Sequence, residues 1–144
     1  MVRGENTPWS TQADVVYRNA KTTAWVNVRW WRNNPGGVLV VPNEHVENLY
    51  GLDRRLAGDI HETARKVALA MRTAFECEGT STRQHNEPGA LQEVWHYHLH
   101  VFPRWTGDEL YGSDARLTEP EEREPYVAAL RQALGKAGSG RMAL

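Results

Sequence analysis

The chain has 144 residues, enough for one domain with a proper core, and its 17 basic and 18 acidic residues leave a net charge of −1. This balance offers no basic excess for a nucleic acid polymer, and no apolar run approaches the roughly 18 residues of a membrane span. The single cysteine, Cys77, excludes a disulfide framework and a cysteine-based zinc site within one chain. Because the N-terminus is polar and lacks the apolar segment of a secretory signal, we expect a cytoplasmic protein with no membrane partner.

The first part of the chain predicts closely spaced strands. Residues 1–13 are polar, and we expect a flexible N-terminal segment there. Runs rich in β-branched and aromatic residues follow and predict strands at 15–17, 22–28 and 38–41. Pro42 ends the third run, and the connection 30–37 closes with the turn-forming sequence Asn-Asn-Pro-Gly-Gly. Strands that lie so close together in sequence favour antiparallel pairing.

From Leu52 onward, apolar residues recur at spacings of three and four, which predicts one long helix. The stripe consists of Leu52, Leu56, Ile60, Ala64, Val67, Met71 and Ala74. We expect Asp53 to cap its N-terminus and Gly79 to follow its C-terminus. His61 lies beside the stripe, and we interpret it as an ordinary surface or boundary histidine.

A polar hairpin and a second helix complete the predicted domain, which covers residues 14–136. Residues 80–86 predict a polar strand, and 105–117 predict a polar loop. Thr118-Glu119-Pro120-Glu121 has the form of a capping box, so we expect a C-terminal helix that is regular from about Arg123, with Pro125 in its first turn. Residues 137–144 predict a flexible tail. This order of elements indicates an α+β fold with a largely antiparallel sheet.

Half of the six histidines fall within five residues, at the alternate positions His96, His98 and His100. Successive side chains of a strand point to opposite faces, so the spacing predicts a strand with three imidazoles on one face. The other face is apolar and consists of Trp95, Tyr97, Leu99 and Val101. Pro103 ends this strand or puts it at a sheet edge. One Leu or Val at each site would pack better, so packing alone does not explain the imidazoles.

Two kinds of chemistry suit such a face. Three histidines are a common zinc pattern, but side chains at i and i+4 of a straight strand start about 13 Å apart. A single metal ion would therefore need other ligands, such as His45 or His85. Alternatively, an imidazole is a good nucleophile, and a covalent intermediate at phosphorus divides one displacement into two easier steps. A polar strand face without chemistry is the third interpretation.

These residues resemble the histidine-triad motif of the HIT superfamily, in which His-x-His-x-His is followed by two apolar residues, here Val101 and Phe102. The resemblance extends to the apolar run 38–45, which ends in Pro-x-x-His, and to the polar residues before the triad. The segment 103–111 is similar to the tail of bacterial members. In all, the resemblance covers about residues 14–112.

The resemblance implies a HIT-like fold with a five-stranded sheet, one long helix and one C-terminal helix. It also implies a nucleotide hydrolase or transferase that cleaves at the α-phosphate of a nucleoside phosphate conjugate, such as a dinucleoside polyphosphate. His98 matches the nucleophile that forms a nucleotidyl-histidine. His100 matches the partner that polarises the phosphate, and His96 matches the partner that handles the proton of the leaving group.

The resemblance further implies a set of substrate-binding residues and a homodimer, with no metal and no cofactor. Asn27 matches the residue that binds the ribose, although capping of a turn explains it equally well. Asn86 and Gln92 match positions that contact phosphate. Trp30 and Trp31 are candidates for an interface or for base stacking, with packing at the core edge as the competing interpretation. Candidates for the base pocket, which the strand core also explains, are Val16, Trp25 and Val26.

Three positions depart from the family pattern. Gly37 stands where members often carry a supporting histidine, Leu91 stands in place of a glycine, and Glu93 stands where a small hydroxyl residue is usual. A carboxylate near a bound phosphate would repel it. Two alternatives therefore stay open, a nucleoside phosphoramidase with the same chemistry and a nucleotide-binding protein without catalysis.

Overall fold

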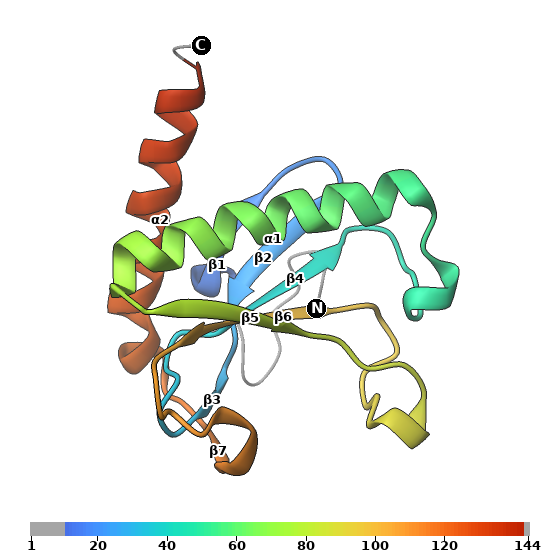
Figure 1. Ribbon diagram of the computed structural model, residues 1–144. Helices are drawn as coiled ribbons and strands as arrows, with labels where there is room; N and C mark the ends of the chain where they lie inside the picture. The colour runs from blue at the N-terminus through green and yellow to red at the C-terminus, as the bar shows by residue number, and fades with distance from the viewer. Residues whose placement is uncertain (1–10, 143–144) are drawn as a thin grey trace.

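The computed structural model describes residues 11–142, with side chains from 11 to 135 (Figure 1). Of the expected flexible segments, residues 1–10 and 143–144 lie outside this range, whereas residues 137–142 form the last part of the C-terminal helix instead of a flexible tail. The described part opens with a 3-10 turn, η1 (Gln12–Asp14), which Thr11 caps by accepting a hydrogen bond from the Ala13 amide at 3.2 Å. None of the described helices is long and apolar enough to span a membrane.

A five-stranded antiparallel sheet forms the centre of the molecule, and it confirms the predicted α+β fold. Its spatial order is β1-β2-β4-β6-β5, and each neighbouring pair is antiparallel. The strands are β1 (Val15–Arg18), β2 (Thr22–Val26), β4 (Val38–Pro42), β5 (Gly79–Arg83) and β6 (Leu99–Arg104). β2 and β4 are buried along their whole length, which matches the continuous apolar sequence of β4, whereas β2 also buries Thr22 and Thr23.

The long helix α1 (Arg54–Phe75) lies across one face of this sheet (Figure 1). Asp53 caps it as expected, because its carboxylate accepts a hydrogen bond from the Leu56 amide at 2.8 Å. The expectation for Gly79 is wrong: Glu76 takes the left-handed conformation that ends the helix, with φ of 51°, and Gly79 begins β5. The core residues of α1 and the sheet that have no exposed surface include Val26, Val40, Ile60, Val67, Met71 and Val101.

The C-terminal helix α2 (Pro120–Met142) packs against α1 and β1. It begins three residues before the expected Arg123, with Pro120 at its first position, so Pro125 falls in its second turn. The start is stabilised by Glu122, whose carboxylate accepts from the Glu119 amide at 3.1 Å. Thr118 is not the cap, since its hydroxyl donates to the Val28 carbonyl at 2.7 Å.

Two short strands pair where the sequence predicted only connections. β3 (Arg29–Trp31) and β7 (Ala115–Leu117) form a separate two-stranded antiparallel sheet, which lies below the main sheet in Figure 1. Their partners are more than eighty positions apart in the chain, so no local pattern reveals the pairing. The remaining turns are η2 (Leu49–Gly51), η3 (Pro88–Ala90) and η4 (Leu110–Gly112).

The histidine segment is only partly a strand, which corrects the expectation of a strand from Trp95. β6 begins at Leu99, and the preceding residues are irregular. The Tyr97 amide donates to the Val46 carbonyl in the loop after β4, at 2.6 Å, instead of joining a ladder. The polar strand β5 likewise ends at Arg83 rather than at Asn86.

Candidate active site around the three histidines

β6 has two chemically different faces. Tyr97, Leu99 and Val101 join the hydrophobic core beneath α1, as the alternation of the sequence predicts. On the other face, His100 lies between its register partners Leu39 of β4 and Arg83 of β5. Directly paired residues of antiparallel strands point to the same face, so His100 has an apolar neighbour on one side and a cationic one on the other.

His98 lies next to His100, with 5.4 Å between the ring centroids. Its Nδ1 is 3.0 Å from the backbone carbonyl oxygen of His96. Because a carbonyl can only accept a hydrogen bond, the proton of a neutral His98 ring belongs on Nδ1. The Nε2 lone pair is therefore left free, and this is the nitrogen that can attack an electrophile.

His96 is held at the end of β4. Its Nε2 donates to the Pro42 carbonyl at 2.9 Å, and its ring lies 5.3 Å from that of His45. Burial lowers the pKa of His96 below its ordinary value, the bond to Pro42 partly offsets this, and the charges of His45 and His98 lower the pKa further. His96 is thus a neutral imidazole at physiological pH.

His100 is held among aromatic rings. It stacks on Phe102 with 5.3 Å between centroids and an interplanar angle of 4°, and the Trp31 ring meets it edge-on at 6.1 Å. Burial lowers the pKa of His100 to about 3, and the charges of His98, Arg83 and His85 act in the same direction. Therefore His100 is neutral as well and can accept or donate a hydrogen bond without carrying charge.

Asn27 lies just after β2 and is buried. Its backbone amide donates to the Gly37 carbonyl at 2.8 Å, and its side-chain oxygen accepts from the Arg29 amide at 3.2 Å. A β-carbon built on Gly37 would lie 3.4 Å from the Phe102 ring. Asn27 and Gly37 therefore lie close to Phe102, the ring on which His100 stacks. Contact of Asn27 with a ribose stays a prediction.

Asn86 and Gln92 join the two loops beside the triad. Asn86 accepts from the Leu49 amide at 2.8 Å. Gln92 is buried, donates to the carbonyl oxygens of Glu47 and Val94 at 2.8 and 3.0 Å, and accepts from the Glu87 amide at 2.6 Å. These bonds position the segment that leads into His96, so each side chain already has a structural role, and phosphate contact stays a prediction.

The two tryptophans proposed for an interface or for stacking differ. Trp30 is buried against Tyr126 of α2, with ring centroids 4.8 Å apart, which favours the packing interpretation. Trp31 is partly buried and meets both Phe102 and His100 edge-on, so it belongs to the surroundings of the site. Glu93 is exposed, as is Leu91, which adopts the left-handed conformation with φ of 69°.

Sequence reasoning missed Arg83, the only charged residue of β5. Its charge was visible in the polar run 80–86, but its place opposite His100 depends on the register of the β5–β6 pair. The sequence does not determine that register, because fifteen residues that include an irregular loop separate the two strands.

The described residues do not form a metal site around the triad. Within residues 11–142, no group of three or more His, Cys, Asp or Glu is arranged so that it could hold a metal ion. His45 approaches His96, but His85 lies on the β5 side, where its charge acts on His100.

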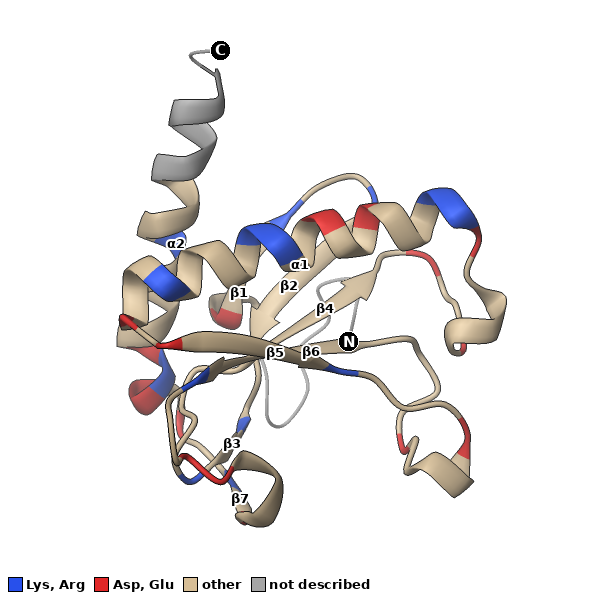
Figure 2. Ribbon diagram, in the orientation of Figure 1, with Lys and Arg blue, Asp and Glu red and all other residues tan. Residues whose placement is uncertain are grey.

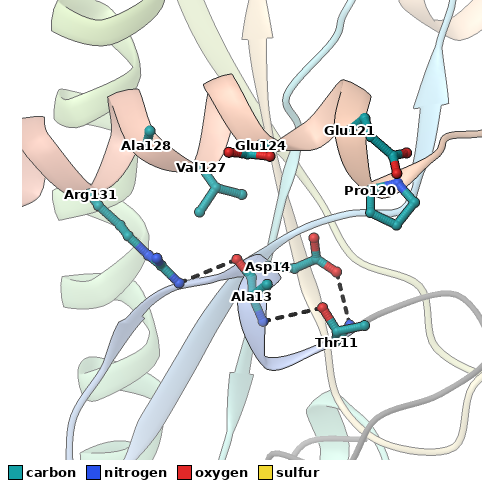
Figure 3. Close-up of a pocket in the computed structure, with 9 residues that line it drawn as sticks. All are labelled: Thr11, Ala13, Asp14, Pro120, Glu121, Glu124, Val127, Ala128 and Arg131. Atoms are coloured by element: carbon teal, nitrogen blue, oxygen red, sulfur yellow. Dashed lines mark hydrogen bonds between the residues drawn. The ribbon is translucent and has the colours of Figure 1, made fainter.

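A separate hollow of about 410 Å³ lies between η1 and the start of α2 (Figure 3). It contains none of the predicted site residues, and Arg131 crosses its edge to donate to the Ala13 carbonyl at 3.2 Å. The carboxylate of Asp14 is already bound by the Thr11 amide and by the buried Arg123, at 2.9 and 2.8 Å. This hollow therefore has a structural explanation and is not part of the histidine site.

Comparison with known proteins confirms the resemblance. A family model described as the HIT domain matches residues 10–107. The protein hit of Bacillus subtilis is 33% identical over 98 residues, which cover 68% of this chain and 66% of that protein. A Schizosaccharomyces pombe protein named bis(5'-nucleosyl)-tetraphosphatase (asymmetrical) is 30% identical over 118 residues, which cover 82% of this chain and 63% of that protein. The chain thus spans about two thirds of the length of these relatives.

A solved structure agrees with the fold. The crystal structure of a zinc-bound histidine triad family protein from Mycobacterium smegmatis matches with a TM-score of 0.77 and 25% identity. The match covers 93% of this chain and 89% of that one.

Proposed function

The chain belongs to the HIT family, and we propose that it is a nucleotide hydrolase or transferase that cleaves nucleoside phosphate conjugates, such as dinucleoside polyphosphates, at the α-phosphate. One observation carries the proposal: the Nδ1 of His98 is 3.0 Å from the His96 carbonyl oxygen, which leaves Nε2 free as a nucleophile. The fission yeast relative named as a tetraphosphatase supports the choice of substrate class.

In the first step, the Nε2 lone pair of His98 attacks the α-phosphorus. A bond forms between Nε2 and phosphorus, and the bond between phosphorus and the leaving oxygen breaks, so the leaving group departs with the electron pair. The His98 ring then carries a positive charge. The carbonyl of His96 stabilises that charge through the Nδ1 proton, since a carbonyl oxygen interacts more strongly with a charged donor.

In the second step, water attacks the same phosphorus and the bond to Nε2 breaks, which returns the electron pair to His98. The products are the nucleoside monophosphate and the free enzyme. Water must lose one proton, and the neutral ring of His96 is a proton acceptor within the triad. A phosphoramidate would follow the same two steps with an amine as leaving group, and the amine would then need a proton.

The test combines turnover with detection of the intermediate. Wild type, His98→Ala and His61→Ala, a surface control on α1, are incubated with a panel of dinucleoside polyphosphates and phosphoramidates, and products are quantified. We expect His98→Ala to lose at least about 10³-fold in rate, as for a nucleophile, while His61→Ala stays at the wild-type rate. Rapid acid-free quenching and mass spectrometry should find a nucleotide adduct in wild type and in His61→Ala, but not in His98→Ala.

Other outcomes identify the alternatives. If wild type turns over none of the panel but still binds AMP, the protein is a nucleotide-binding module. If His98→Ala is as active as wild type, the proposed nucleophile is wrong. The homodimer and the cytoplasmic location stay predictions, and sedimentation of the purified chain tests the first of them.

A further inference from the structure

The triad lies between two unlike flanks on the face of the sheet away from α1. On the β2–β4 side, an apolar flank consists of Trp25, Leu39 and Val41, which pack together and are buried. On the β5 side, the flank is cationic because it contains Arg83, whose register partner is His100. A nucleotide conjugate is similarly divided, because the base is a flat apolar group and the phosphate chain is anionic.

Arg83 has an unusual environment for a cation. The central carbon of its guanidinium lies 4.9 Å from the centroid of the Trp31 ring, 5.1 Å from that of Phe102 and 5.6 Å from that of Tyr111. Its Nε is buried and has no hydrogen-bond partner. Aromatic faces attract the cation and restrict its position, but they accept no conventional hydrogen bond.

Arg83 also forms no ion pair with any carboxylate among the described residues. The contrast is Arg104 at the end of β6, which also lies over the Tyr111 ring but is paired with Asp108 at 2.7 Å. Figure 2 shows that charge is sparse on the central strands, with basic segments at the ends of β5 and β6. A partly buried cation without a counter-ion is costly in a folded protein, and a bound anion would remove that cost.

The imidazoles do not supply this positive charge themselves. Both His96 and His100 have lowered pKa values, mainly because they are buried, and are neutral at physiological pH. Arg83 is therefore the fixed cation next to His100, and an arginine stays protonated throughout the physiological range. Its planar guanidinium can also donate two parallel hydrogen bonds to one phosphate group.

We propose that Arg83 binds the phosphate chain of the leaving group, so that the site prefers conjugates with an anionic leaving group over those that release an uncharged amine. The nucleoside then lies on the β2–β4 side of the triad, and the phosphate chain crosses the triad towards β5. This inference rests on the proposed function and selects the dinucleoside polyphosphate class over the phosphoramidate class.

The test compares Arg83→Gln, Arg83→Lys and the matched control Arg18→Gln, which removes the same charge at the end of the opposite edge strand, β1. We measure kcat/KM for diadenosine tetraphosphate and for adenosine 5'-phosphoramidate. Loss of one charged hydrogen-bonding contact should lower kcat/KM for the tetraphosphate by about 10- to 100-fold and for the phosphoramidate by less than about 3-fold. Arg83→Lys should recover part of the loss, and Arg18→Gln should match wild type.

An equal loss of kcat/KM on both substrates, together with a lower midpoint of unfolding, would mean that Arg83 only holds the rings of Trp31, Phe102 and Tyr111 in place. No loss of kcat/KM on either substrate would mean that Arg83 does not contact the phosphate chain. Both results overturn the inference.

A binding measurement separates this inference from the proposed reaction. Inorganic tripolyphosphate is titrated into wild type and Arg83→Gln at low and moderate salt, followed by calorimetry. If wild type turns over no substrate, the proposed function fails, but saturable tripolyphosphate binding that Arg83→Gln weakens at least about 10-fold still supports the anion site. Equal binding by the two proteins overturns the anion site, whatever the turnover.

Discussion

The two faces of β6 differ in what they do for the protein. Leu99 and Val101 face α1 and are buried among aliphatic neighbours, where their contribution is to stability. His100 of β6 and His98, just before the strand, have partly exposed rings; His98 has a hydrogen bond to the backbone and His100 stacks on Phe102. The difference teaches that one short strand can carry the core on alternate residues while the residues between them are free for chemistry.

The sharpest test substitutes two neighbours that belong to different faces. Leu99→Ala should lower the free energy of unfolding by about 3 kcal/mol, because it removes buried methyl groups and leaves a cavity. His98→Ala should change it by less than about 1 kcal/mol, as for a substitution outside the core. Denaturant unfolding gives both values, and turnover per folded molecule should be kept in the first variant and lost in the second.

The distinction between the core face and the histidine face would be contradicted if His98→Ala proved as destabilising as Leu99→Ala. The histidine face would then be part of the core, and loss of turnover could not be assigned to chemistry.

A smaller effect is expected at two adjacent glycines that face the two sides. Gly36 has a φ of +89°, and a β-carbon there would lie 2.8 Å from Tyr126 and 2.9 Å from Phe75, on the helix side. Gly36→Ala should therefore cost about 2 kcal/mol through strain and overlap. Gly37 faces Phe102 at an ordinary contact distance, so Gly37→Ala should stay within about 1 kcal/mol of wild type. Thermal unfolding of both variants shows whether Gly36→Ala is the more destabilising of the two. Equal destabilisation by the two substitutions would contradict this prediction.

The smallest effect, taken per pH unit, is the pH dependence of stability contributed by His100. Burial lowers its pKa from 6.5 to about 3 in the folded protein. Between these values the unfolded chain binds a proton that the folded chain does not, so stability falls as pH drops below 6.5, by at most about 1.4 kcal/mol per pH unit. Groups whose charges act on His100 are His98, Arg83 and His85.

The measurement is urea unfolding at several pH values for wild type, His100→Gln and the exposed control His61→Gln. His100→Gln should flatten the loss of stability below pH 6.5, while His61→Gln should keep the wild-type slope. An unchanged slope in His100→Gln would mean that another group controls the pH dependence.

Much of this arrangement follows from local pattern. The stripe from Leu56 to Met71 predicts α1, because a helix repeats every 3.6 residues and neighbouring positions alone determine which side chains share its face. The alternation from His96 to His100 identifies the reactive group for a similar reason, although the first two histidines precede β6. Asp53 as a cap also depends only on its own neighbours in sequence.

Tertiary structure decided what depends on distant partners. The Tyr97 amide donates a hydrogen bond to the Val46 carbonyl, so β6 begins only at Leu99. β3 pairs with β7, which lies more than eighty residues further along the chain. His45 approaches His96, and Arg83 lies opposite His100, only because two pairs of strands adopt one register. The sequence by itself determined that three imidazoles gather at one place, because their spacing is local. The tautomers of His96 and His98, the neutrality of His96 and His100, and the cation beside His100 were decided by backbone carbonyls, burial and strand register, which arise only when distant segments pack together.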